Sequence, residues 1–256
     1  MEEKVSYYEG KAGGQHAEGC RLEVPPEPWM SLPLRGGPRR PSLPYRQPQQ
    51  GRDYWIVDGI LPNAQDVVNR SLARTEWERG LPHRPETWPG MRASGALLPE
   101  ELTAVEARVC ALTGARRLWK ETDPQGATLN HNVIQMVAAS ESGPRPHTDS
   151  RVLCRFAAVI YLTPGAPAGA GTTFYRLRYP DGTLSGNLCP APHVSLRDAL
   201  GVATLPLQAW HPELSVPNVF NRMLLYRADM VHSATAYFGK ELKDRRMTAV
   251  FFWMAV

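Results

Sequence analysis

A histidine and an aspartate flank a threonine at His147-Thr148-Asp149, where a polar, proline-containing segment meets a long apolar run. In an extended segment, side chains two residues apart project to the same side. One imidazole and one carboxylate on the same side form half of a metal site, so a third ligand has to come from elsewhere in the chain. His232, which follows the apolar segment NRMLLYRAD, is the candidate.

Two histidines and one carboxylate on one face are the ligand set that holds ferrous iron and leaves the opposite face of the ion open. Open positions suit oxygen chemistry, because a co-substrate and dioxygen must both reach the metal. The remaining histidines lie in polar or proline-rich surroundings and are expected on the surface or in loops, although His131 and His211 could reach the site. They are His16, His83, His131, His193 and His211.

A pair of arginines opens the apolar segment RRMTAVFFW near the end of the chain. An arginine that enters a β core is costly unless it meets an anion, and its planar fork matches a carboxylate. Arg246 and Thr248 share one face of a strand, so we expect them to bind the distal carboxylate of a dicarboxylic keto acid. Arg245 is expected to form a solvated pair with Asp244, but the opposite assignment of the two arginines stays open.

The composition is that of a globular protein, with 256 residues, 43% hydrophobic and 21% charged, and a net charge of +4. The basic residues are scattered and are not interleaved with aromatic residues, which argues against binding to nucleic acid. We find no signal-like leader and no apolar run that could span a bilayer, and the four cysteines form no CxxC pair. These features favour a cytoplasmic protein that does not bind membranes.

The chain divides into an arm at residues 1–52, rich in proline and glycine, and a single domain at residues 53–256. The arm is either disordered or anchored across the body through Trp29, Met30, Leu32, Leu34 and Tyr45, and the sequence leaves both readings open. Helices are predicted at 63–77, with Asn63 as its cap, and at 100–113, with Gly114 at its C-terminal end. The segment between them, RPETWPGMRASGALLP, is predicted to be a loop.

Short apolar segments with turn residues between them follow, and they predict a mainly β fold with flanking helices, an α+β sandwich or barrel. The segment at about 180–220 is predicted to be a long loop on the substrate side, because loops of this length inside a domain are usually functional.

At these residues the chain resembles the iron(II)- and 2-oxoglutarate-dependent dioxygenases, whose pattern is HxD, a distal His, and an Arg with a Ser or Thr two residues on. It looks closest to a bacterial subgroup of uncharacterised 2-oxoglutarate oxygenase-like proteins, through DYWIVDGILPNAQDVV, WPGMRA, HTDS, VIYLTP, GTTFYR, NRMLLYRADMVHSATAYFG and RMTAVFF. The likeness covers roughly residues 53–256. It implies a double-stranded β-helix, also called a jelly roll or cupin-like fold, with the metal inside its open end.

The resemblance also implies the cofactors and the chemistry. His147, Asp149 and His232 would bind Fe(II), Arg246 and Thr248 would hold 2-oxoglutarate, and O₂ would be the oxidant for attack on an unactivated C–H bond by hydroxylation, desaturation or ring closure. Asp149 speaks against halogenation, because family halogenases lack this carboxylate. The remaining candidates are Gln135 and Tyr161 for 2-oxoglutarate, and Asn132, Arg155, Tyr175 and Arg92 for the substrate.

We expect the substrate to be a small molecule, such as an amino-acid-derived intermediate of secondary metabolism. One alternative is a jelly-roll metal-dependent isomerase or hydrolase, which would keep the three ligands but have no use for Arg246 and Thr248. Another is a non-catalytic binding module with an idle site. A nucleic acid demethylase would need a basic, aromatic groove, which the sequence does not contain.

Overall fold

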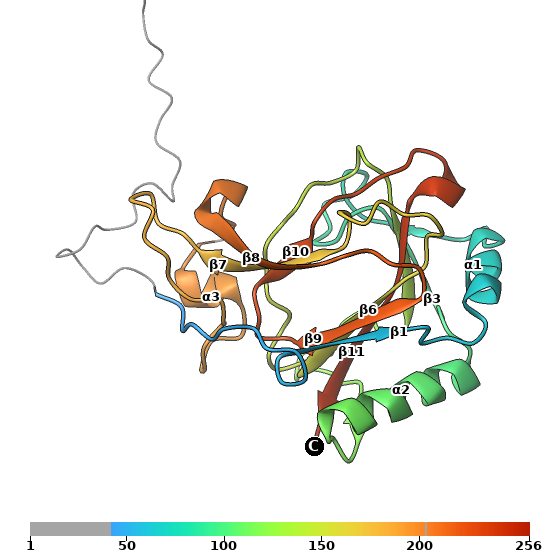
Figure 1. Cartoon of the computed structure of the whole chain (residues 1–256), viewed down its shortest axis with the longest axis horizontal. Helices are drawn as coiled ribbons and strands as arrows, with labels where there is room; N and C mark the ends of the chain where they lie inside the picture. The colour runs from blue at the N-terminus through green and yellow to red at the C-terminus, as the bar shows by residue number, and fades with distance from the viewer. Residues whose placement is uncertain (1–41, 203) are drawn as a thin grey trace, which may run out of the picture.

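Two antiparallel sheets face each other in the computed structural model, which describes residues 42–202 and 204–256 (Figure 1). The larger sheet has the strand order β1-β9-β6-β11-β5-β3-β2, with β4 paired to β11, and the smaller has the order β10-β7-β8. The bounds of the larger sheet's strands are β1 Tyr54–Asp58, β2 Glu78–Arg79, β3 Met91–Ser94, β4 Leu118–Trp119, β5 Val133–Val137, β6 Phe156–Tyr161, β9 Arg222–Arg227 and β11 Arg246–Ala255. Those of the smaller sheet are β7 Thr172–Leu177, β8 Trp210–Val216 and β10 His232–Ala234. This is the jelly-roll arrangement expected from the sequence.

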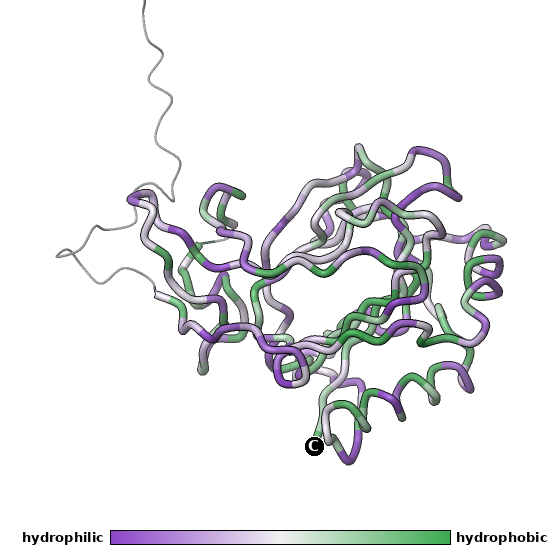
Figure 2. Tube along the Cα trace, in the orientation of Figure 1, coloured by the Kyte–Doolittle hydropathy of each residue, from purple (hydrophilic) through white to green (hydrophobic). Residues whose placement is uncertain are grey.

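Strand β11 shows how one strand supplies both the core and the site, because alternate side chains point to opposite faces of a sheet. Met247, Ala249, Phe251 and Trp253 pack in the cluster that includes the two long helices. Arg246, Thr248, Val250 and Phe252 alternate with them, and the latter two belong to the cluster that both sheets share. Figure 2 shows the hydrophobic residues concentrated along the strands of the larger sheet. The period of two therefore places Arg246 and Thr248 between the sheets.

Helices α1 (Ala64–Leu72) and α2 (Pro99–Thr113) cover the outer face of the larger sheet (Figure 1). The second helix confirms its prediction, and Gly114 adopts the left-handed conformation at φ 75° that ends it. The first helix is shorter than predicted, because residues 73–77 leave it and Arg74 donates hydrogen bonds to the carbonyls of Ser94 and Gly95. Asn63 makes no side-chain cap and instead donates to Glu101.

Two segments predicted as loops contain strands. Within the first, at 84–99, the chain forms β3, which extends the larger sheet beyond β5 and pairs in turn with β2. Within 180–220, the chain forms α3 (Leu196–Leu200), the 3₁₀ turn η2 (Leu207–Ala209) and strand β8, which pairs with β7. Pro212 lies within β8, which is at the edge of its sheet, where a missing N–H is tolerated. A second 3₁₀ turn, η3 (Leu242–Asp244), precedes β11.

Part of the predicted arm is fixed to the body. The Leu43 side chain is buried. The Arg46 backbone N–H donates to the Asn187 side-chain oxygen at 3.0 Å, and the Asn187 side-chain amide donates to the Arg46 carbonyl at 2.7 Å. Gly186 lies directly against Pro44, so closely that a Cβ there would overlap the Pro44 carbonyl. Residues 1–41, including Trp29, Met30, Leu32 and Leu34, lie outside the described residues.

Among the described residues, no helix has the length and apolarity needed to cross a bilayer. Cys110, Cys154 and Cys189 are free thiols, and Cys20 lies outside the described part of the chain.

The close contact between β7 and β8 gives a stability prediction. An ideal Cβ at Gly171 would lie 1.9 Å from the Val216 carbonyl oxygen, so Gly171→Ala must push the two strands apart. We expect a loss of about 1–3 kcal/mol in the free energy of unfolding, measured by denaturant titration. Gly169→Ala is the matched control, because nothing lies within 4 Å of its Cβ position. Equal stability of the two variants would contradict the close contact.

Candidate metal centre

Backbone pairing brings the predicted metal ligands together. His147 and His232 exchange two backbone hydrogen bonds, of 3.0 and 2.9 Å, and the Asp149 N–H donates to the Ala228 carbonyl at 3.0 Å. The segment 147–149 therefore runs beside the turn that joins β9 to β10. The prediction that these three residues converge is confirmed, since one ligand atom of each lies within 4.8 Å of the others.

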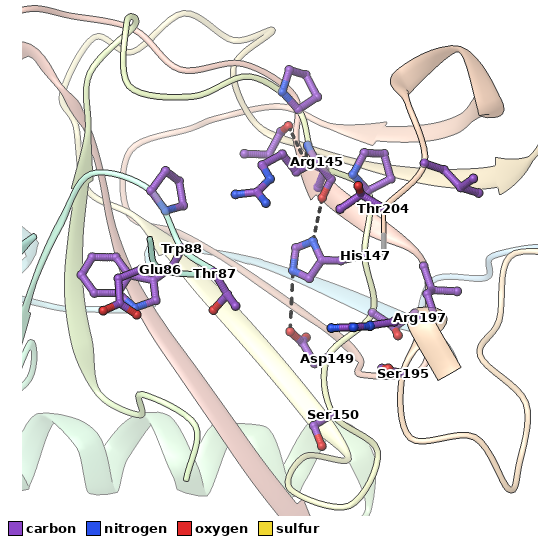
Figure 3. A pocket seen from close by; sticks show the side chains of 18 of the residues that line it. Glu86, Thr87, Trp88, Arg145, His147, Asp149, Ser150, Ser195, Arg197 and Thr204 are labelled. Carbon is purple, nitrogen blue, oxygen red and sulfur yellow. Dashed lines mark hydrogen bonds and ion pairs between the residues drawn. The ribbon is translucent and has the colours of Figure 1, made fainter. Parts of the chain in front are cut away.

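Both imidazoles are oriented by carbonyl oxygens. His147 Nδ1 lies 2.8 Å from the Arg145 carbonyl, and His232 Nδ1 lies 2.9 Å from the Met230 carbonyl. Because a carbonyl only accepts, each Nδ1 carries a proton and each Nε2 keeps its lone pair for a metal. His147 Nε2 is 3.9 Å from Asp149 Oδ1, and His232 Nε2 is 3.7 Å from Asp149 Oδ2. Figure 3 shows the imidazole of His147 between Arg145 and Asp149.

The Asp149 carboxylate is buried, and its Oδ2 has no hydrogen-bond partner among the described residues. Burial raises its pKa to about 6, against the lowering effect of the charges of His147 and Arg92. Burial also lowers the pKa of His232 to about 3, and the charge of His147 adds to this effect. A buried carboxylate without partners is costly unless a cation neutralises it. The donor set of two neutral imidazole nitrogens and one carboxylate fits a divalent transition metal such as Fe(II).

Tyr226, which the sequence did not single out, lies against the same centre. Its hydroxyl is 2.9 Å from His232 Nε2, the nitrogen that faces Asp149. Because His232 carries its proton on Nδ1, the phenol must donate this hydrogen bond. The phenol therefore occupies the lone pair that a metal would use.

A row of polar side chains crosses the inner face of the larger sheet. Thr248 on β11 is in register with Gln135 on β5 and with Tyr161 on β6, and Arg246 stands two residues before it. The Tyr161 hydroxyl donates to Thr172 at 2.8 Å. Gln135 accepts from Arg92 at 3.3 Å and donates to the Pro89 carbonyl at 2.9 Å. The sequence-predicted 2-oxoglutarate residues thus lie on one surface.

Arg246 is the buried member of the arginine pair. It is 4% exposed, and its Nε and Nη2 donate to the carbonyls of Ala170 and Gly171, both at 3.2 Å. Within the described ranges no carboxylate lies within ion-pair distance of it, and the buried Thr248 hydroxyl has no hydrogen-bond partner there. Arg245 instead pairs with Glu141 at 3.1 Å, so the expected partner Asp244 is replaced by a residue from another loop. A buried guanidinium beside an unpaired hydroxyl fits an anion.

A cavity of about 800 Å³ opens onto the metal centre. His147 and Asp149 form part of its wall, and several residues between Ser195 and Leu207 form another part. Its apolar lining residues are Trp88, Leu129, Leu196, Leu200, Val202, Leu205, Leu207, Trp210 and Phe252. Of the segment at about 180–220, the part around α3 is the part that contributes most to the lining of this cavity.

Of the four sequence-predicted substrate contacts, only Arg92 lines this cavity. Asn132 sits at φ 52°, and its amide exchanges hydrogen bonds with the Leu97 backbone at 2.9 and 3.0 Å, so it holds a turn. Tyr175 packs in the cluster on the far side of the smaller sheet, and Arg155 reaches the Ala255 carbonyl at 3.5 Å. His131 is engaged by the Phe252 backbone, and His211 is exposed on β8. The cavity residues Arg145, Arg197 and Tyr237 were not predicted from the sequence.

No family model and no curated protein matches the chain. Solved structures similar to it include the epimerase SnoN from nogalamycin biosynthesis in complex with Fe³⁺, alpha ketoglutarate and nogalamycin RO, at 18% identity and a TM-score of 0.45, covering 79% of each chain. HygX from Streptomyces hygroscopicus with nickel, 2-oxoglutarate and hygromycin B bound is 16% identical, with a TM-score of 0.43 over 78% of this chain and 82% of that one. A Pseudomonas putida prolyl-4-hydroxylase is 15% identical, with a TM-score of 0.41 over 79% and 92%. At these identities and scores, the likenesses assign no ligand or reaction to this chain.

The raised pKa of Asp149 predicts how metal affinity depends on pH. His232 stays neutral above a pH of about 3, whereas Asp149 loses its proton only as the pH rises through about 6. Because a protonated carboxyl is a poor ligand and one proton is displaced, Co(II) affinity should rise about fivefold from pH 5 to pH 6 and about twofold from pH 6 to pH 7. Titrations at pH 5, 6 and 7 measure this. Asp149→Asn, which has no such proton, should bind weakly throughout, and a wild-type affinity independent of pH would contradict the assignment.

The position of Tyr226 predicts a gain in metal affinity when its hydroxyl is removed. In Tyr226→Phe, His232 Nε2 loses the partner that competes with the metal, so Co(II) should bind up to about tenfold more tightly. Anaerobic Co(II) titration followed by its visible absorption measures the change. His211→Ala, an exposed histidine on β8, serves as the control and should leave the affinity unchanged. A tenfold weaker affinity of Tyr226→Phe would show instead that the phenol supports the bound metal.

Proposed function

We propose that this protein is an iron(II)- and 2-oxoglutarate-dependent oxygenase that acts on a small molecule. The observation that carries the proposal is that two buried side chains of opposite charge each lack a partner of the other sign. The carboxylate of Asp149 lacks a cation, and the guanidinium of Arg246 lacks an anion, within the described chain. A ferrous ion and a dicarboxylic keto acid would meet both.

His147, Asp149 and His232 would hold the iron through two Nε2 atoms and the carboxylate. Bound ferrous iron would supply the activation of dioxygen that accompanies decarboxylation of 2-oxoglutarate to succinate and carbon dioxide. The carbonyl contacts of Arg145 and Met230 keep each imidazole in the tautomer that can ligate a metal. Asp149 would be ionised in that complex, because the metal ion stabilises its charge.

Arg246 and Thr248 would hold the distal carboxylate of 2-oxoglutarate. The two carbonyl contacts of Arg246 fix its guanidinium plane, so little conformational freedom is lost when the anion binds. Thr248 would donate from the hydroxyl that is otherwise unpaired. Gln135 and Tyr161, in register with Thr248 on either side, would flank the co-substrate.

The cavity would hold the substrate beside the metal. Its volume of about 800 Å³ lies within the range of pockets that enclose drug-sized molecules. Its apolar wall would exclude water and orient one C–H bond toward the iron. The proposed outcome is hydroxylation, ring closure or desaturation of an intermediate of secondary metabolism, such as an amino-acid derivative. A metal-dependent isomerase or hydrolase would leave Arg246 and Thr248 without a role.

The decisive experiment compares the two neighbouring arginines. Anaerobic wild-type protein should show a weak visible charge-transfer band on addition of Fe(II) and 2-oxoglutarate. Arg246→Gln should raise the apparent Kd for 2-oxoglutarate by about 10–100-fold, because it removes a charged hydrogen-bond donor from a buried anion. Arg245→Gln, whose guanidinium pairs with Glu141, should change it by less than about threefold.

Co(II) affinity and thermal unfolding of both variants separate a local effect from misfolding. Succinate release in air, with Fe(II) and 2-oxoglutarate, then tests the reaction itself. A wild-type protein that forms neither the band nor succinate would overturn the proposed function, and an equal loss in both variants would overturn the assignment of Arg246.

A further inference from the structure

We propose that Arg92 binds an oxyanion of the substrate, so that the substrate is a small molecule with a carboxylate or phosphate group and an apolar body. This inference rests on the proposed function and names the class of molecule that the same cavity accepts.

The surroundings of Arg92 fit an oxyanion. It lies on β3 opposite Gln135, and its guanidinium stacks over the Trp88 ring at 4.6 Å from the centroid. Its Nη2 donates to the Gln135 amide oxygen at 3.3 Å, while its buried Nε has no partner among the described residues. No carboxylate of the described ranges lies within ion-pair distance of it. A stacked, oriented guanidinium with a spare donor suits a bidentate oxyanion.

Arg92 and Arg246 act on the same phenol, but the two guanidinium groups would bind different anions. Burial raises the pKa of Tyr237, and the positive charges of Arg246, Arg145 and Arg92 oppose this effect, so all three act on one phenol. Arg246 lies 5.8 Å from the Tyr237 ring and serves the distal carboxylate in the proposed function. The other end of 2-oxoglutarate would lie at the metal. Arg92, which lines the cavity, is therefore available for a second anion.

The rest of the cavity wall favours an anionic molecule with an apolar body. Arg145 and Arg197 also line it and have no carboxylate within ion-pair distance in the described chain, whereas Glu86 is the acidic lining residue besides the metal ligand Asp149. In Figure 3, Arg197 extends from α3 toward His147 and Asp149. The apolar residues of the α3 side complete the wall. Arg92, His147 and Asp149 line the same cavity, so an oxyanion on Arg92 would leave the attached body in the space that opens onto the metal centre.

The test compares 4-phenylbutyrate, 3-phenylpropyl phosphate and the neutral 4-phenylbutyramide. Binding is followed by tryptophan fluorescence, because Trp88 and Trp210 line the cavity. It is measured with metal-free protein and with protein loaded with Ni(II) and 2-oxoglutarate. We expect at least one acid to bind the wild type about tenfold more tightly than the amide. The acid that binds with the lower Kd indicates whether the substrate carries a carboxylate or a phosphate group.

Arg92→Gln should reduce this preference to less than about threefold, and Arg92→Lys should keep part of it. Arg155→Gln, an arginine outside the cavity, should leave it unchanged. Equal binding of acids and amide by the wild type, no binding of either acid at millimolar concentration, or a preference that survives in Arg92→Gln would each overturn the proposal.

The 2-oxoglutarate titration separates this inference from the proposed function. Arg92→Gln should keep the wild-type Kd for 2-oxoglutarate within about threefold. If it abolishes 2-oxoglutarate binding while Arg246→Gln retains it, Arg92 is the co-substrate anchor and the inference is overturned. If the wild type shows no 2-oxoglutarate band at all, the proposed function fails, and the comparison of acids with the amide in metal-free protein still decides the anion site.

Discussion

The two backbone hydrogen bonds between His147 and His232 are the interaction on which the site depends. They lock a segment that precedes β6 to the start of β10, and they hold two imidazoles side by side with ring centroids 4.5 Å apart. A side chain alone could not position ligands so distant in sequence, because each would retain its own rotamer freedom. Backbone pairing fixes how far apart the two side chains begin, and the carbonyls of Arg145 and Met230 then remove the rotamer freedom of each ring.

The alternation of β11 links this centre to the core. One face of the strand packs on the helices, and the other carries Arg246 and Thr248 between the sheets. A shift of register by one residue would expose the core face and turn Arg246 away, so the apolar packing of Phe251 and Trp253 also fixes the polar row. Stability and the proposed co-substrate site thus depend on the same strand register.

The sequence predicted the parts of the molecule that depend on short-range periodicity. The common side of His147 and Asp149, the preferred inward direction of Arg246, α2 and the main strands follow from spacing and alternation, whereas His232 was chosen only for its place after an apolar segment. The role of Asn132 did not follow, because its positive φ removes it from the strand pattern. Strand β8 was missed because proline is tolerated only where the tertiary structure leaves a sheet edge free. Tyr226 was missed because its role depends on the position of His232, which no local pattern of β9 specifies.

The wall of the cavity around α3 belongs to the connection between β7 and β8, whereas the metal ligands and the polar row lie on or beside strands of the two-sheet body. Changes of length or composition in that connection would leave intact the hydrogen bonds between neighbouring strands of the larger sheet. Under the proposed function, the fold therefore separates the residues that would bind the metal and the co-substrate from those that would contact the substrate. Exchange of residues 195–207 for other sequences is the natural route by which evolution, or an engineer, would redirect this scaffold to new substrates.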